Sequence, residues 1–206
     1  MERNYAGLPP DAFEKVDPAN DDLFYAEPRL VRHIDDAAVA ALTRLYAAML
    51  PERGVILDVM SACVSHLPPD FTGRVVGHGM NADELAANPQ LDDFFVQNLN
   101  REPALPLDNA TFDAALCCVG VQYLTQPDRV FDELARVLRP GAPMIVSFSN
   151  RCFPTKAVTV WRALDARGHT ELVAYYLHGA GFRQITPHVL RDGLDSDPLI
   201  AVTGYR

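Results

Sequence analysis

Residues 106–150 constrain the fold of this chain more than any other segment. They run through a polar turn, an apolar stretch, a second loop, an amphipathic stretch, Pro140-Gly141 and a final apolar stretch. The amphipathic stretch has apolar residues at helical spacing, and a Pro-Gly pair is a typical stop signal for a helix. Apolar runs between turn signals predict buried strands. The segment therefore predicts a strand, a helix and a second strand.

The same alternation extends through the rest of the chain. Apolar runs predict strands at 55–59, 74–79 and 94–99, and two acidic residues followed by helical spacing predict a helix from Asp35 to Leu50. After residue 150 we expect helices near 156–166 and 169–181, and a closing pair of strands at 182–190 and 198–206. Strands that alternate with helices indicate an α/β fold with a mostly parallel sheet and helices on both faces. We expect seven strands, with an antiparallel strand at the C-terminal end.

The length of 206 residues and the 49% hydrophobic content suit a single α/β domain. We assign this domain to residues 35–206. Residues 1–34 are rich in Pro, Asp and Asn with scattered aromatic residues, so we expect a segment that covers the core. Tyr25 lies in the part of this cover where a substrate would meet it.

Charge and hydropathy exclude several classes of partner. The net charge of -9, with no cluster of Lys or Arg, argues against a nucleic-acid substrate. We find neither an N-terminal apolar leader nor the roughly 18 apolar residues that a membrane span needs, and we predict a cytoplasmic protein with no membrane partner. The four cysteines show no zinc-ligand spacing, so no metal is expected.

Two motifs in residues 105–147 resemble those of class I S-adenosylmethionine-dependent methyltransferases of type 11. LPLDNATFDAAL is similar to that family's LPFPDNSFDVV, and ELARVLRPGAPMIVS is similar to its ELARVLRPGG and the strand that follows. The resemblance implies a Rossmann-like fold, S-adenosylmethionine as cofactor, and methyl transfer to a small molecule. It covers nearly the whole chain from Asp35 onward.

The family's glycine-rich first motif, VLDLGCGTG, corresponds to residues 56–64. Leu57 and Asp58 match, whereas Met60, Ala62 and Val64 stand at the three glycine positions. These glycines let the backbone approach the methionine part of the cofactor. The resemblance implies cofactor contacts from Asp58, Met60, Ser61 and Ala62 in a rebuilt turn. We expect the cysteines to be buried reduced thiols. The alternative is a redox or nucleophilic role for Cys63, which would lie in a loop that opens a helix, where a thiolate is favoured.

The second and third cofactor motifs are altered as well. The acidic residue that accepts hydrogen bonds from the ribose is replaced by Gly79, and Met80 takes the place of the residue that stacks on adenine. Asn81, Asp83 or Glu84 could replace the lost acid, although acidic residues at a helix start commonly serve as caps. Asn98, Leu99 and Cys118 complete the cofactor residues that the resemblance implies.

We expect the substrate side of the crevice to include Tyr25, Gln122, Tyr123, Arg151 and Lys156. The two cations favour an anionic substrate, unless they are ordinary surface residues. Instead of contacting a substrate, Gln122 could equally be a polar group at a strand end and Tyr123 a packed aromatic residue. His66 is a candidate general base or a solvated loop histidine.

The sequence is compatible with three functions. The first is methyl transfer to a small molecule, which needs no metal and relies mainly on positioning. The second is a non-catalytic or repurposed protein of the same fold that binds another ligand or a protein partner in the crevice. The third is a different reaction that uses Cys63 or His66.

Overall fold

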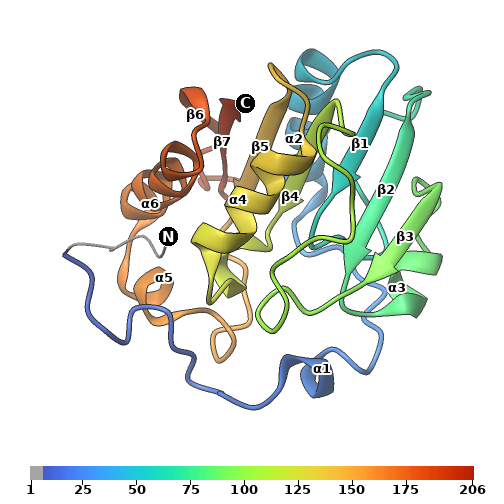
Figure 1. Ribbon diagram of the computed structural model, residues 1–206. Coiled ribbons are helices and arrows are strands. Elements are labelled where there is room, and N and C mark those ends of the chain that lie inside the picture. The colour runs from blue at the N-terminus through green and yellow to red at the C-terminus, as the bar shows by residue number, and fades with distance from the viewer. Residues whose placement is uncertain (1–6) are drawn as a thin grey trace.

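The computed structural model describes residues 7–206, which form one seven-stranded sheet in the order β3-β2-β1-β4-β5-β7-β6 (Figure 1). The strands are β1 Val55–Asp58, β2 Arg74–Gly79, β3 Asp93–Val96, β4 Ala114–Cys118, β5 Pro143–Phe148, β6 Arg183–Arg191 and β7 Leu199–Tyr205. The first five strands are parallel, and β7 is antiparallel to both of its neighbours. The predicted α/β sheet with an antiparallel C-terminal strand is confirmed.

The helices are mostly those that the apolar spacing predicts. They are α1 Asp21–Phe24, α2 Asp36–Met49, α3 Ala82–Ala86, α4 Pro127–Val137, α5 Thr159–Ala163 and α6 Ala166–Gly179. The Asp35 carboxylate caps α2 by accepting a 2.8 Å hydrogen bond from the Ala38 N–H. Gly181, with φ of +87°, takes the left-handed conformation that ends α6.

The sheet has a hydrophobic core on each face. On one face α4 and α6 pack against residues such as Leu57, Ala115 and Val146. On the other face α2 packs against their sequence neighbours, among them Ile56 and Ala114. Neighbouring strand residues thus point to opposite cores, as expected for strands that are covered on both sides.

Two predicted helical regions differ from the structure. No helix forms between β1 and β2, where residues 59–73 are irregular, so Cys63 does not open a helix. The prolines at 68 and 69 and the glycine at 73 disfavour a helix in this stretch. The helix expected at 156–166 is limited to the five residues of α5.

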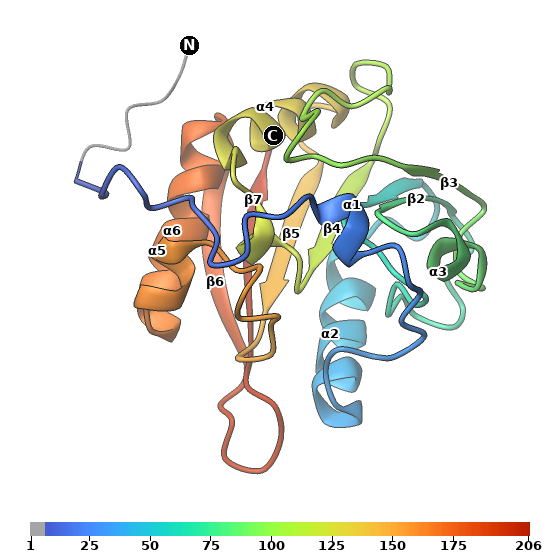
Figure 2. The same cartoon turned by 90° about the horizontal axis from the view of Figure 1, so that it is seen from below.

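The N-terminal segment runs along the edge where the parallel strands end. Figures 1 and 2 show it in blue, passing the ends of β5 and β4 before it reaches α1 and turns into α2. It is fixed by backbone hydrogen bonds to the segment after β5, such as Asp17 N–H to Thr155 O at 2.9 Å. Among residues 7–206 no helix is long and apolar enough to span a membrane.

Candidate functional site

A cavity of about 330 Å³ lies at the carboxyl ends of β1, β2 and β4. The sheet order reverses between β1 and β4, and this switch point is where open α/β sheets bind ligands. The volume is within the range of small-molecule sites. The residues predicted for the cofactor all line it: Asp58, Met60, Ser61, Ala62, Gly79, Met80, Asn98, Leu99 and Cys118.

Met60 fills the space where the first motif was expected to leave backbone exposed. Its φ of +58° is left-handed, so the backbone keeps a conformation that glycine adopts more easily. A Cβ at Gly120 would lie only 2.7 Å from the Met60 Cβ, which shows that the two residues are in close contact. The Met60 side chain therefore lies between the ends of β1 and β4.

Gly79 has no room for the carboxylate that the resemblance expects there. A Cβ at this position would lie 2.7 Å from the carbonyl oxygen of Ser61 and 3.1 Å from Leu85 Cδ2. The Ser61 N–H donates to the carbonyl of His78 at 2.7 Å, which holds the rebuilt loop against the end of β2. Glycine at this position is thus required by the course of the loop.

His78 joins the rebuilt loop to the sheet. Its Nδ1 accepts a 3.1 Å hydrogen bond from the Met60 N–H, and its Nε2 lies 2.9 Å from the carbonyl oxygen of Gln97. This pattern requires a neutral ring with the proton on Nε2. Burial lowers the pKa of His78 to about 4, which agrees with a neutral ring. Hence His78 has a structural role in shaping the cavity.

Asp58 is a buried carboxylate on the wall formed by β1. It accepts a 2.6 Å hydrogen bond from the Ser61 hydroxyl. Burial raises the pKa of Asp58 to about 6, and hydrogen bonds from Ser61 and Ser65 oppose that rise. The carboxylate therefore fixes the loop and adds negative potential to the cavity near neutral pH.

His66 lines the cavity and is unusual in two respects. Its φ is +59°, and its buried Nδ1 has no hydrogen-bond partner in the described part of the chain. The Thr43 hydroxyl donates to the His66 carbonyl at 2.9 Å and so supports this backbone conformation. The pKa of His66 is lowered to about 4, mainly by burial and also by Arg32 and His33. At neutral pH the ring is uncharged and has an unused nitrogen.

Left-handed backbone conformations are concentrated at this site. Residues 7–206 contain five non-glycine residues with positive φ, and three of them, Met60, His66 and Val119, line the cavity. Val119 is β-branched, and such residues rarely adopt this conformation. Backbone strain of this kind is typically found at functional sites.

The N-terminal segment bonds to the polar residues at the ends of β2 and β3. The Asn98 amide donates to Asp22 at 2.9 Å, while its oxygen accepts from the Asn100 N–H at 3.0 Å. The Asn81 amide donates to the carbonyls of Tyr25 and Ala26, each at 3.0 Å. The cover is thus attached directly to residues beside the proposed adenosine region.

Aromatic rings form the wall next to this cover. Phe153 lies 5.2 Å from Phe24 and 6.0 Å from Tyr123, measured between ring centroids, and the second pair is stacked. The Tyr123 hydroxyl accepts a 2.9 Å hydrogen bond from the Phe153 N–H. Tyr25 and Tyr123 line the cavity, and burial raises the pKa of Tyr123 to about 12, so both serve as neutral, amphipathic wall residues.

Two predicted substrate residues do not reach the cavity. The Lys156 side chain is fully buried, with Nζ 2.8 Å from the Ala19 carbonyl and 3.0 Å from the Asp17 carboxylate, so it attaches the cover to the core. Gln122 is 1% exposed and donates to the Val119 carbonyl at 2.7 Å. The expectation that Lys156 lies at the crevice edge was wrong, because the N-terminal segment encloses its ammonium group.

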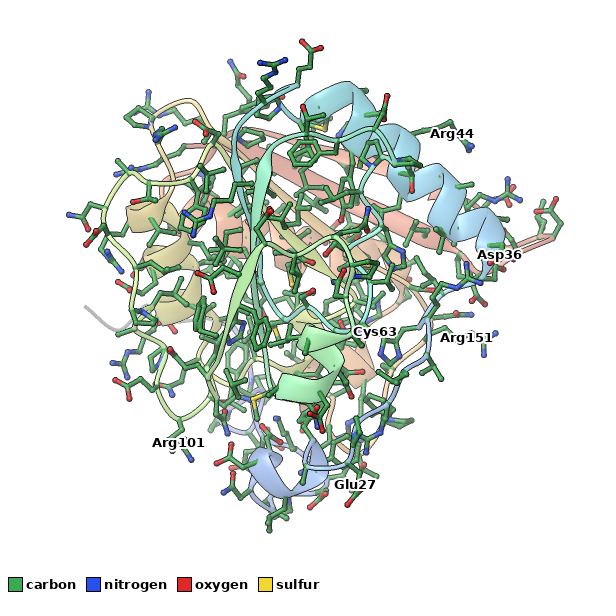
Figure 3. The ribbon with its side chains drawn as sticks, turned by 90° about the vertical axis from the view of Figure 1, so that its right-hand side faces the viewer. Glu27, Asp36, Arg44, Cys63, Arg101 and Arg151 are labelled. Carbon is green, nitrogen blue, oxygen red and sulfur yellow. The ribbon has the colours of Figure 1, made fainter. Side chains whose placement is uncertain are left out.

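Arg151 does line the cavity and extends to the molecular surface, as Figure 3 shows. Its side chain is 64% exposed, and Nε donates to Asp197 at 2.9 Å. Arg32 lies on the same cavity wall but was not among the predicted site residues. Its position in a polar N-terminal segment gave no signal, since the cavity wall is formed by segments far apart in sequence.

The thiols in and beside the cavity are not activated. Cys63, labelled in Figure 3, lies 3.7 Å from the carbonyl oxygen of Val31, and burial raises its pKa. Burial also raises the pKa of Cys118 to about 12. The alternative of a favoured thiolate at Cys63 was wrong, because no helix begins there. In the described residues no group of three His, Cys, Asp or Glu could hold a metal ion.

The residues that line the cavity are compatible with a nucleoside cofactor, although the glycines of the first motif are absent. Met80, Asn98 and Leu99 line the cavity where β2 and β3 end, and Glu84 lines it as well. The changed residues, Met60 and Gly79, pack at the strand ends without closing the cavity. We conclude that the site fits such a group with a rebuilt first loop.

Among known protein families, residues 63–146 match the methyltransferase domain. The match covers less than half of the chain and begins directly after Ala62, so it leaves out β1 and most of the altered turn. It includes the motifs of the β4-to-β5 segment. No curated protein matches the chain.

Many solved structures share the fold. One is an S-adenosylmethionine-dependent methyltransferase from Mesorhizobium loti, with 18% identity and a TM-score of 0.56 over 81% of this chain and 98% of that one. Another is phosphoethanolamine N-methyltransferase 2 from Haemonchus contortus, solved with phosphomonomethylethanolamine and S-adenosylhomocysteine, with 12% identity, a TM-score of 0.56 and coverage of 82% and 52%. A third is the [4+2]-cyclase SpnF, with 17% identity, a TM-score of 0.58 and coverage of 80% and 79%.

Proposed function

We propose that this chain binds S-adenosylmethionine and methylates a small molecule, because it has the class I methyltransferase fold and matches the methyltransferase domain over residues 63–146. The observation that carries the proposal is the cavity at the switch point of the sheet, lined by every residue that the resemblance assigns to the cofactor. A cytoplasmic location stays a prediction from the sequence.

The cofactor, when bound, supplies a strongly electrophilic methyl group on a sulfonium centre. The residues of the chain position and enclose the reactants. Asp58 and Glu84 supply negative potential on the wall, and such potential favours a cationic ligand. The N-terminal segment and the aromatic wall of Tyr25, Tyr123 and Phe153 limit the entry of water.

We further propose that the methyl acceptor is an anion. Arg32 and Arg151 both line the cavity, and their side chains are 53% and 64% exposed. Each already has a carboxylate partner, at 2.6 Å for Asp36 and at 2.9 Å for Asp197. Exposed ion pairs of this kind contribute little energy, so a substrate anion could compete for these guanidinium groups.

A repurposed site remains the second candidate. Met60 occupies the space beside Gly120, which is the specific observation in its favour. The [4+2]-cyclase among the structural relatives has the same fold and a name that denotes a different reaction.

Calorimetric titration with S-adenosylmethionine and S-adenosylhomocysteine tests the proposal, at concentrations that detect a dissociation constant of about 1 mM. We expect both to bind. A matched pair of variants tests whether the cofactor binds in the cavity. Met80→Lys adds a cation inside the cavity and should abolish binding. Val96→Lys adds a cation on β3 outside the cavity and should leave binding unchanged. No binding to the wild type would favour the repurposed site.

A further inference from the structure

The end of β2 lacks a carboxylate and has no space for one. Gly79 occupies this position, and a Cβ there would overlap the carbonyl oxygen of Ser61, 2.7 Å away. A nucleoside bound at this edge of the sheet presents two adjacent ribose hydroxyls, and α/β dinucleotide-binding folds meet such a group with an acidic side chain. The acceptor has to come from another element.

Glu84 supplies a carboxylate to the same cavity from the first turn of α3. The residue is 8% exposed, although Glu is rarely buried without a partner. One oxygen, Oε1, accepts a 2.6 Å hydrogen bond from the Arg29 N–H. Nothing in the described part of the chain donates to Oε2, so the carboxylate retains acceptor capacity beside the cavity.

The other two candidates at this helix start are Asn81, whose side chain is already hydrogen-bonded, and Asp83, which does not line the cavity. The Asn81 oxygen caps α3 by accepting from the N–H groups of Asp83 and Glu84, and its amide nitrogen donates to the N-terminal segment. Asp83 is exposed and is not among the residues that line the cavity. Of the three residues, only Glu84 has a free acceptor at the cavity.

We propose that Glu84 accepts the hydrogen bonds of the ribose hydroxyls of the bound cofactor and so replaces the missing acidic residue at the end of β2. This inference rests on the proposed function, because it requires a nucleoside ligand in the cavity. A carboxylate can accept from two neighbouring hydroxyls at once, and hydrogen bonds to a charged acceptor are stronger than neutral ones. The bond from Arg29 also makes the position of this carboxylate depend on the N-terminal cover.

The experiment measures binding of S-adenosylhomocysteine, adenosine and 2′,3′-dideoxyadenosine by calorimetry. The wild type should bind adenosine about tenfold to a hundredfold more tightly than the dideoxy compound, as expected for hydrogen bonds to a charged group. Glu84→Gln keeps an oxygen for the Arg29 N–H and should lose most of this preference along with about tenfold of the affinity for S-adenosylhomocysteine. Asp83→Asn removes a neighbouring charge outside the cavity and should change neither.

The outcomes separate this inference from the proposed function. Absence of S-adenosylhomocysteine binding to the wild type would overturn both. Binding without a preference for the ribose hydroxyls, or an unchanged preference in folded Glu84→Gln, would overturn the role of Glu84 alone. The wild-type comparison of the two nucleosides needs no variant, so it decides the question even if Glu84→Gln fails to fold.

Discussion

The segment from β4 to β5 and the strand ends around β1 and β2 belong to one sheet but differ in what fixes them. In the first region, apolar spacing and the Pro140-Gly141 stop specify a strand, a helix and a strand, and these form as the pattern predicts. In the second region, a loop without a helix follows β1 and rests on Gly79 and His78. The scaffold of this fold is thus kept while the loop beside the cavity is rebuilt.

The largest effect is expected in the scaffold region. Phe131 in α4 is 1% exposed and lies 5.5 Å from the Tyr176 ring. Phe131→Ala should lower the free energy of unfolding by about 4 kcal/mol through lost burial and a new cavity, measured by urea denaturation. The control Phe94→Ala on β3, where the side chain is 37% exposed, should cost clearly less. Equal costs would contradict the view that α4 belongs to the core.

Replacement of the two cations that follow β5, Lys156 and Arg151, should lower the free energy of unfolding by different amounts. Lys156→Met removes a fully buried ammonium and leaves the Asp17 and Asp21 carboxylates without it, so we expect a loss of about 3 kcal/mol in the free energy of unfolding. Arg151→Met should cost less than about 1 kcal/mol, because its ion pair is mostly exposed. Denaturant unfolding of both variants measures the difference, and similar losses would mean that Lys156 does not hold the cover.

The rebuilt loop should make the protein sensitive to acid. The pKa of His66 is about 4 in the folded state and about 6.5 in an unfolded chain, so the unfolded state binds more protons between these values. The contribution of neutral His66 to the free energy of unfolding is therefore fully present above pH 6.5. It falls as the pH falls, by about 2 kcal/mol at pH 5. Buried His78 acts in the same direction, whereas the raised pKa of Asp58 opposes both.

His66→Asn checks this effect, since Asn tolerates the left-handed backbone of this position. The difference in the free energy of unfolding between pH 7 and pH 5 should shrink in this variant. It should stay as in the wild type for His178→Asn, a change at an exposed residue of α6. An unchanged pH dependence in His66→Asn would show that His66 is not the titrating group.

The smallest effect is expected at Gly79, which stands at the end of β2 where the family has an acidic residue. Gly79→Asp should lower the free energy of unfolding by at least about 1 kcal/mol, because its Cβ overlaps the Ser61 carbonyl, and should not tighten S-adenosylhomocysteine binding. Thermal unfolding and calorimetry measure both. Met60→Gly is the contrasting change, because it relieves a left-handed backbone and should stay within about 1 kcal/mol of the wild type. Tighter binding by a stable Gly79→Asp protein would refute our account of the loop.

The residues expected to bind a cofactor came from the resemblance to the methyltransferase family and not from any local pattern. The sequence pattern alone predicts the sheet, most of its helices and the crevice at the strand ends. These depend on apolar periodicity, on caps and on breakers, all of which are local properties of the chain. Three other features emerge only when the chain is folded: Lys156 is enclosed, Gly79 has no room for a side chain, and Glu84 lines the cavity while Asp83 is exposed. Each of these depends on contacts between segments distant in sequence, such as residue 29 with residue 84 and residue 17 with residue 156, which no local pattern records.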